Sequence, residues 1–220
     1  MDHIHLPIVV AVVIAYVAGS IPSAYLAGKW HGVDLRKHGS GNLGATNVVR
    51  VLGIRIGALV FLVDTLKGFL PVFFLPALTG TLHPEMVALT IGAAAIVGHV
   101  RPVFLLGQKG GKGVATAGGV FLGVAWLPAL LAFAVWIVVF ATSRYVSVAS
   151  LSAALALPIA FFLTGSRFSD PYFIAAIVVA LFVFFTHRAN IGRLRRGEEH
   201  RFARGRGTNA AAEPQPPHAA

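Results

Sequence analysis

Long apolar stretches, most of them near the length that crosses a lipid bilayer, constrain this chain more than any other feature. A membrane-spanning helix needs about 20 mostly apolar residues, with about 17 to 25 tolerated. Such stretches, some of them short, cover residues 4–27, 56–79, 86–100, 148–163 and 172–186. The chain is 56% hydrophobic and 12% charged, whereas soluble domains are about 25% charged. The surplus apolar surface must face lipid, which predicts an all-α, polytopic membrane protein.

The segment 114–142 allows two interpretations. As one helix it would be about 43 Å long, against about 30 Å of bilayer hydrocarbon. It contains several glycines and the sequence Trp126-Leu127-Pro128. It is therefore either one long tilted span or two short helices that turn near Pro128.

The distribution of Lys and Arg favours the pair of short helices. The chain then crosses the membrane seven times. Every Lys and Arg falls on the cytoplasmic side, except Arg167, which lies outside, and Lys67, which lies within a span. A single span at 114–142 would place Arg144 and the C-terminal arginines outside, against the positive-inside rule. We expect seven transmembrane helices, two of them short and sheltered by neighbours, with the N-terminus outside and the C-terminus cytoplasmic.

The domain organisation follows from the same pattern. Residues 1–200 form one integral membrane domain, and residues 201–220 form a tail that is basic at first and then rich in Ala and Pro. The Ala- and Pro-rich part has the composition of a disordered segment. The N-terminus lacks the Lys or Arg of a cleavable signal peptide, so the first apolar stretch is expected to be retained.

The first polar loop has the composition of an anion-binding site. Glycines let consecutive backbone N–H groups point at one anion, and hydroxyl and amide side chains add donors. An arginine can bind phosphate with two hydrogen bonds. The alternative is a flexible connector, which would not need amide and apolar residues interleaved. The candidate binding residues here are Ser40, Asn42, Thr46, Asn47 and Arg50.

The second polar loop ends in Gly110-Gly111-Lys112-Gly113, directly before a predicted helix. Free backbone N–H groups and the positive end of the helix dipole would then lie beside a lysine. The loop is not a nucleotide-binding P-loop, because Leu106 and Gly113 stand where that motif needs Gly and Ser or Thr. The alternative is a basic turn at the membrane interface. His99 precedes this loop and is a further candidate.

The last two polar regions add donors near the same predicted face. Ser147 and Ser150 lie one helical turn apart, where they could either bind substrate or serve helix packing. His187 and Asn190 are three residues apart and share a helix face, with Arg193 following. We expect this last group to contact substrate.

The remaining charges and the missing motifs narrow the chemistry. Asp64 and Lys67 lie within a predicted span, three residues apart, and are interpreted as a structural ion pair. No cluster of carboxylates predicts a metal site, and no Cys or Gly-x-Ser-x-Gly motif offers a nucleophile. We therefore expect no metal, no cofactor and no nucleic-acid partner, and a substrate that brings its own activated group.

Three motifs, taken in order, resemble a known family. They are Ser40-Gly41-Asn42-Leu43-Gly44-Ala45-Thr46-Asn47, the segment from Gly98-His99 to Gly113-Val114-Ala115-Thr116, and His187-Arg188-Ala189-Asn190-Ile191 with Arg193-Leu194. The chain from about residue 10 to 200 is similar to the bacterial acyl-phosphate-dependent glycerol-3-phosphate acyltransferases. One departure lies at 105–109, where the family more often has an aromatic residue and smaller side chains, which leaves the roles of Gln108 and Lys109 open.

The resemblance implies transfer of a fatty acyl group from acyl phosphate to glycerol 3-phosphate in the bacterial inner membrane. The product would be lysophosphatidate, an intermediate of phospholipid synthesis, formed by loops at the cytoplasmic side. Ser40, Arg50 and Lys112 are the implied phosphate ligands, with Asn42, Thr46 and Asn47 shaping the pocket. His187 and Asn190 would orient the glycerol. With Lys112 they are the implied catalytic residues.

The sequence leaves more than one candidate for the general base and for the class of protein. His187, His99 or an oxygen of a substrate phosphate could take the hydroxyl proton, and the substrate is favoured because neither histidine has an obvious orienting carboxylate. The competing class is a membrane transporter or channel for an anionic solute. Transporters often show inverted repeats and ionisable residues near the membrane midplane, whereas here no repeat is visible and the polar groups gather at one predicted face. A structural scaffold would leave the glycine-rich turn unexplained.

Overall fold

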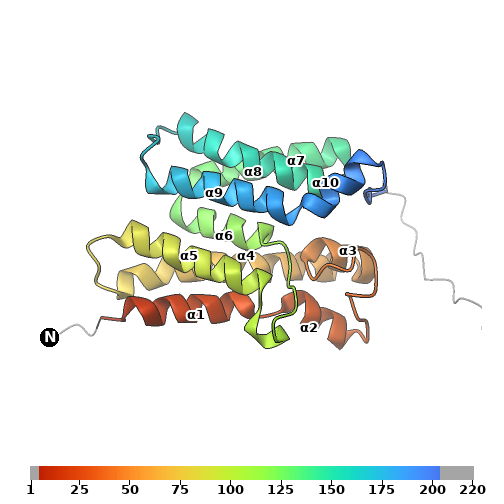
Figure 1. Cartoon of the computed structure of the whole chain (residues 1–220), viewed down its shortest axis with the longest axis horizontal. Coiled ribbons are helices and arrows are strands. Elements are labelled where there is room, and N and C mark those ends of the chain that lie inside the picture. Colours follow the sequence, from red (N-terminus) through yellow and green to blue (C-terminus); the bar gives the residue numbers. More distant parts are fainter. Residues whose placement is uncertain (1–4, 204–220) are drawn as a thin grey trace, which may run out of the picture.

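The computed structural model describes residues 5–203, and over this range the chain is helical, with no strand. The helices lie along one common axis in two layers, with α6 between them (Figure 1). The elements are α1 (Ile8–Ser20), α2 (Ser23–Trp30), α3 (Ala45–Leu52), α4 (Ile54–Leu78), α5 (Pro84–Val100), the 3-10 helix η1 (Val103–Leu105), α6 (Val114–Val124), α7 (Trp126–Ser143), α8 (Val146–Leu163), α9 (Pro171–Thr186) and α10 (Arg188–Arg195). One layer contains α1, α2, α4 and α5, and the other contains α7 to α10.

Within residues 5–203, five helical stretches are long and apolar enough to cross a membrane. They are Ile8–Trp30, Ile54–Leu78, Pro84–Leu105, Trp126–Ser143 and Val146–Leu163. A sixth is obtained if α9 and α10, which meet at a bend of 57°, are taken as one span. The all-helical polytopic architecture is therefore confirmed, and the seventh predicted crossing corresponds to the shorter apolar helix α6.

The segment 114–142 divides into two helices, as the favoured interpretation of the sequence predicted. The break is at Ala125 (φ −155°), three residues before Pro128. Pro128 lies in the first turn of α7, where a missing N–H costs little because the first N–H groups of a helix have no acceptor. As a result α7 has 18 residues and passes as a span, so the prediction that both helices are short is wrong for α7.

Glycines bring the central helices into close contact. A Cβ on Gly68 would lie 2.0 Å from a backbone oxygen of α6, and one on Gly119 would lie 1.9 Å from a backbone oxygen of α4. Gly19 and Gly98 face the backbones of α5 and α1 in the same way, at 2.2 and 2.3 Å. Backbones that approach this closely gain van der Waals contact, which drives helix association in lipid where burial of apolar surface does not.

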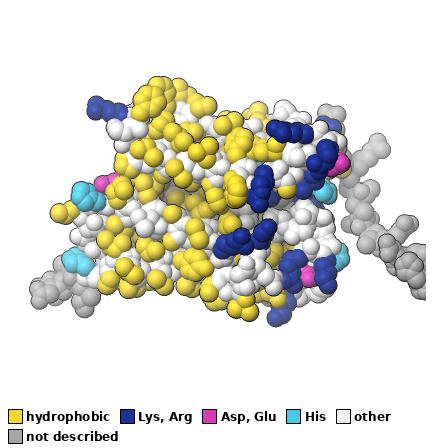
Figure 2. All heavy atoms as spheres, viewed as in Figure 1, with side chains coloured by type: hydrophobic (Ala, Val, Ile, Leu, Met, Phe, Trp, Pro, Cys, Tyr) yellow, Lys and Arg dark blue, Asp and Glu magenta, His cyan; other side chains and the backbone are white. Residues whose placement is uncertain are grey.

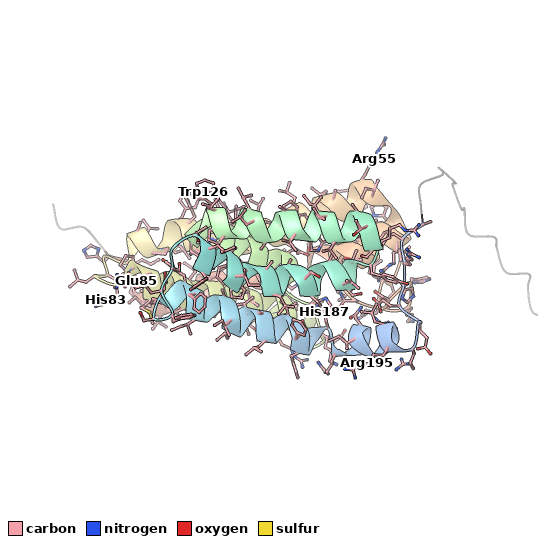
Figure 3. The ribbon with its side chains drawn as sticks, turned by 90° about the horizontal axis from the view of Figure 1, so that it is seen from above. Arg55, His83, Glu85, Trp126, His187 and Arg195 are labelled. Atoms are coloured by element: carbon pink, nitrogen blue, oxygen red, sulfur yellow. The ribbon has the colours of Figure 1, made fainter. Side chains whose placement is uncertain are left out.

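The surface separates a basic end from an apolar body. Figure 2 shows most of the visible Lys and Arg side chains at the end where α2, α3 and α10 lie, and mainly hydrophobic side chains over the middle of that face. Figure 3 places Arg55 and Arg195 at that end, and His83, Glu85 and Trp126 at the other. The glycine-rich loops and the last helix therefore share one end of the molecule, as expected.

Candidate active site

Two of the predicted residues meet directly at the basic end. The Lys112 ammonium, in the turn before α6, donates a hydrogen bond to the side-chain oxygen of Asn190 on α10. Thr186, at the end of α9, donates a long hydrogen bond of 3.4 Å to the Lys112 backbone carbonyl. The glycine-rich turn and the last helix, 78 residues apart in the chain, thus form one site.

Glu199 joins this pair from the segment that follows α10. One of its carboxylate oxygens accepts from the Asn190 amide at 2.6 Å, and the other accepts from Arg193 Nε at 2.7 Å. Glu199 is 8% exposed. Burial by itself would raise the pKa of this carboxyl, but the hydrogen bonds from Asn190 and Arg193 outweigh it and hold the pKa below its usual value. Glu199 is therefore a buried anion that orients two predicted site residues.

The site carries more positive than negative charge. Lys112 and Arg50 both lie within electrostatic reach of Arg193 and of Glu199. Burial, aided by Arg193 and Arg50, lowers the pKa of Lys112 to about 8. Burial likewise lowers the pKa of Arg50, although a guanidinium stays charged. Three cations around one carboxylate provide the excess positive charge that a phosphate needs.

His187 lies between α9 and α10, buried beside Lys112 (Figure 3). Its Nδ1 is 2.8 Å from the carbonyl oxygen of Val183. Because a carbonyl can only accept, Nδ1 carries the proton, and in the neutral ring Nε2 is an acceptor. His187 therefore presents an acceptor nitrogen suited to a substrate hydroxyl.

The first polar loop is held in shape by Asn47. Its side-chain oxygen accepts from the Ser40 backbone N–H at 2.8 Å, and its amide donates to the carbonyls of Leu35 and His38. Gly39 and Gly41, on either side of Ser40, adopt positive φ, at 60° and 68°, which a glycine tolerates best. The buried Asn47 side chain thus shapes the loop around Ser40 instead of facing a ligand. Asn42 and Thr46 lie half-buried in the same region, and none of the side-chain hydrogen bonds found among the described residues uses them.

The second polar loop lies on His99. Gly110 and Gly111 pack so closely that a Cβ on either would lie 2.0 or 2.2 Å from His99 atoms. Gly113 precedes α6 at φ 82°. His99 is 7% exposed, so the structure places this predicted binding residue beneath the loop, where it supports the loop backbone.

The Asp64–Lys67 pair is buried, as predicted, and belongs to a larger polar cluster. Lys67 Nζ and Ser23 Oγ each donate to the same Asp64 oxygen at 2.5 Å, and His99 Nδ1 lies 3.7 Å from it. The cluster connects α2, α4 and α5 directly under Gly110 and Gly111. The two charges neutralise each other in this buried cluster beneath the loop, as expected of a structural ion pair.

The two predicted serines of α8, Ser147 and Ser150, have different surroundings. Ser150 Oγ accepts from the Trp136 indole N–H at 3.3 Å, a packing contact between α7 and α8. Ser147 lies beside Glu199 and contributes to the low pKa of that carboxyl, yet its buried hydroxyl makes no hydrogen bond of ordinary geometry with any described residue. Ser147 thus remains near the site, and Ser150 is explained by helix packing.

Comparison with known proteins decides the family. The sequence profile described as "Glycerol-3-phosphate acyltransferase" matches residues 9–197. The chain belongs to the glycerol-3-phosphate acyltransferase family. The Geobacter sulfurreducens glycerol-3-phosphate acyltransferase is 47% identical over 190 residues, which cover 86% of this chain and 94% of that one.

Solved structures agree with this assignment. Two crystal structures of PlsY, an integral membrane glycerol 3-phosphate acyltransferase, are similar to this chain. The glycerol 3-phosphate form is 42% identical with a TM-score of 0.79, and the match covers 89% of this chain and 96% of that chain. The lysophosphatidic acid form is 40% identical with a TM-score of 0.77, and the match covers 89% of this chain and 95% of that chain. This acyltransferase therefore shares both sequence and helical architecture with its relatives.

Two residues of this site were not predicted from the sequence. Glu199 and Phe202 follow the last helix, beyond the stretch matched by the family profile. Glu199 lies at the end of the predicted membrane domain, and Phe202 lies in the predicted basic tail. The pair Glu198-Glu199 among arginines was the available signal, because a carboxylate surrounded by basic residues is often an internal ion-pair partner.

Proposed function

We propose that this acyltransferase uses acyl phosphate as donor and forms lysophosphatidate from glycerol 3-phosphate. The observation that carries the proposal is the convergence of Arg50, Lys112 and Arg193 around Glu199 at the basic end. Such a site suits the phosphates of both substrates. The relative solved in a lysophosphatidic acid form supports the product.

The reaction needs no protein nucleophile. The glycerol hydroxyl oxygen attacks the acyl carbonyl carbon, a new ester bond forms, and the bond from that carbon to the phosphate oxygen breaks. The electrons of the broken bond leave with phosphate, and the hydroxyl proton passes to a phosphate oxygen, whose second pKa is about 6. Lys112 and Arg50 would stabilise the leaving phosphate, while the loop that contains Ser40 would supply backbone N–H groups.

We assign His187 to orientation of glycerol 3-phosphate. Its Nδ1 is committed to the Val183 carbonyl, which leaves Nε2 to accept from a glycerol hydroxyl. Asn190 is held by Lys112 and Glu199 on the same side. No carboxylate hydrogen-bonds to His187 among the described residues, and a carboxylate would be the usual way to make its ring a stronger base.

His187→Ala tests this assignment. We expect KM for glycerol 3-phosphate to rise about tenfold or more, because one hydrogen bond to a buried polar group is lost, while the shape of the pH–rate profile is retained. The measurement is kcat and KM from pH 6 to 9. Loss of one limb of the profile with an unchanged KM would instead make His187 the general base.

We also propose the complete topology. The chain would cross the inner membrane of a bacterium seven times, with α6 as the short crossing between α4, α5, α7 and α9. The N-terminus would be outside, and the basic end with the active site would be cytoplasmic. This orientation follows the positive-inside rule and brings the site to water-soluble glycerol 3-phosphate, while acyl chains stay in the bilayer.

One assay tests the donor and product. The purified enzyme in detergent is given palmitoyl phosphate and radiolabelled glycerol 3-phosphate, and labelled lysophosphatidate is measured. Palmitoyl coenzyme A serves as the competing donor, and Lys112→Ala as the inactive control. Product from the coenzyme A ester alone would contradict the acyl phosphate proposal. Flux of glycerol 3-phosphate into liposomes without any product would favour a transporter.

A further inference from the structure

A short segment after α10 crosses the active site, and we name residues 197–203 the C-terminal strap. It starts at Gly197, which has φ 72° and turns the chain away from the helix. The strap is fixed at both ends. Glu199 binds Asn190 and Arg193, and the Phe202 backbone N–H donates to the Arg144 carbonyl at 3.0 Å.

The strap is also attached to the α7–α8 connection by a side chain. Arg201 Nε donates to the Ser143 carbonyl at 3.2 Å, and its guanidinium lies over the Tyr145 ring at 5.5 Å. These contacts set the direction of the chain on either side of Phe202. The Phe202 ring is therefore held in one place by its neighbours along the strap.

Phe202 stands between Arg50 and the second layer. The Arg50 guanidinium carbon is 5.1 Å from the centre of the Phe202 ring, within the range of a cation–π contact. The ring also meets Phe140 of α7 edge to face, with centres 5.6 Å apart. Helix α3 otherwise packs mainly on α4, and α7 mainly on α8. Phe202 thus links the helix of Arg50 to the opposite layer.

From this geometry we propose that Phe202 is a positioning residue for Arg50, so that the strap completes the phosphate site. The inference rests on the proposed function of Arg50 as a phosphate ligand. Arg50 has no ion-pair partner within salt-bridge distance among the described residues. A flexible guanidinium without a fixed partner binds less tightly because its rotamers must be ordered on binding. The Phe202 ring restricts the rotamers of Arg50 and leaves its positive charge available for phosphate, whereas a carboxylate partner would neutralise that charge.

The test compares Phe202→Leu with Phe202→Tyr in the full chain. Leucine keeps an apolar side chain but removes the aromatic face, and we expect KM for glycerol 3-phosphate to rise about 3- to 10-fold. The kcat value and the thermal unfolding midpoint should change little. Tyrosine keeps the face and should restore the wild-type KM. The control Phe140→Leu removes the edge contact but not the contact to Arg50, so its KM should stay near that of the wild type.

A double-mutant cycle separates positioning from general packing. In an Arg50→Gln background the guanidinium is absent, so Phe202→Leu should cause no further rise in KM. Equal effects of Phe202→Leu with and without Arg50, or a KM unchanged by Phe202→Leu, would overturn the inference. Calorimetric binding of glycerol 3-phosphate to the purified variants, without any acyl donor, makes the same comparison. Weaker binding in Phe202→Leu would uphold the inference even if palmitoyl phosphate proved not to be the donor.

Discussion

At the scale of single residues, burial shifts the pKa values of charged side chains in the active site. Lys112 is the clearest case, since burial and neighbouring arginines bring its pKa to about 8, near physiological pH. The depressed pKa also shows that, without an anion, the ammonium is disfavoured there. A bound phosphate dianion would reverse that effect, so binding of substrate and protonation of Lys112 are coupled.

This coupling predicts the pH dependence of substrate affinity. Lys112 is charged below pH 8 and loses its proton as the pH rises through that value, whereas the phosphate stays a dianion above about pH 6. KM for glycerol 3-phosphate should therefore be flat from pH 7 to about 8 and then rise towards pH 10. Lys112→Arg keeps its charge over this range and should show a flatter curve. A wild-type KM that is constant to pH 9.5 would contradict the assignment.

Glu199 supplies the counter-charge of the same site. Glu199→Gln keeps the shape but removes the charge and the hydrogen bond from Arg193, which we expect to cost about 1.5–3 kcal/mol. Glycerol 3-phosphate or inorganic phosphate should restore part of this stability, because the anion neutralises the same cations. The measurement is the unfolding midpoint with and without ligand. The neighbouring Glu198→Gln, which breaks only an exposed pair with Arg196, should change stability by no more than about 0.5 kcal/mol. Equal losses in both variants would argue against a special role of Glu199.

At the scale of helices, the close backbone contact between α4 and α6 fixes the position of the glycine-rich turn that precedes α6. Helix α6 starts at the end of that turn, and its contact with α4 depends on Gly119, whose added Cβ would lie 1.9 Å from the Thr65 carbonyl oxygen. The adjacent Gly118 is exposed and has no neighbouring atom within 4 Å of such a Cβ. The two glycines therefore provide a matched pair on one helix.

We expect Gly119→Ala to separate α4 from α6, with a loss of about 1–3 kcal/mol from overpacking and a fall in kcat as Lys112 moves. Gly118→Ala should be neutral or stabilising by up to about 1 kcal/mol, because alanine favours a helix. Unfolding midpoints in detergent and kcat values are compared for the two variants. Similar stability of both would mean that the α4–α6 contact can relax at little cost.

At the scale of the whole molecule, a topology can be tested because the chain contains no cysteine. Single cysteines can be placed at exposed positions at the two ends, Lys37→Cys at the basic end and Ser169→Cys at the other. In intact cells a membrane-impermeant maleimide should label Ser169→Cys only. Lys37→Cys should react after the membrane is made permeable. The reverse pattern would contradict the proposed orientation.

The sequence alone determined the class of the protein and the composition of its site. Apolar stretches of span length leave no other way to satisfy the backbone than helices in a membrane, and local motifs place glycines, lysine and histidine where an anion could bind. The sequence did not determine which partners the polar side chains of the site hydrogen-bond to. Asn47 and His99 belong to the predicted site, yet their side chains support its loops, because contacts across the fold and not residue type decide which atoms remain free.

Only the tertiary structure decided how the site is completed. Glu199 and Phe202 lie in an arginine-rich segment in which no site residue was predicted, and only the turn at Gly197 brings them to Asn190, Arg193 and Arg50. Apolar periodicity and motif spacing are local properties of a chain, whereas charge pairing depends on distances between segments far apart in sequence.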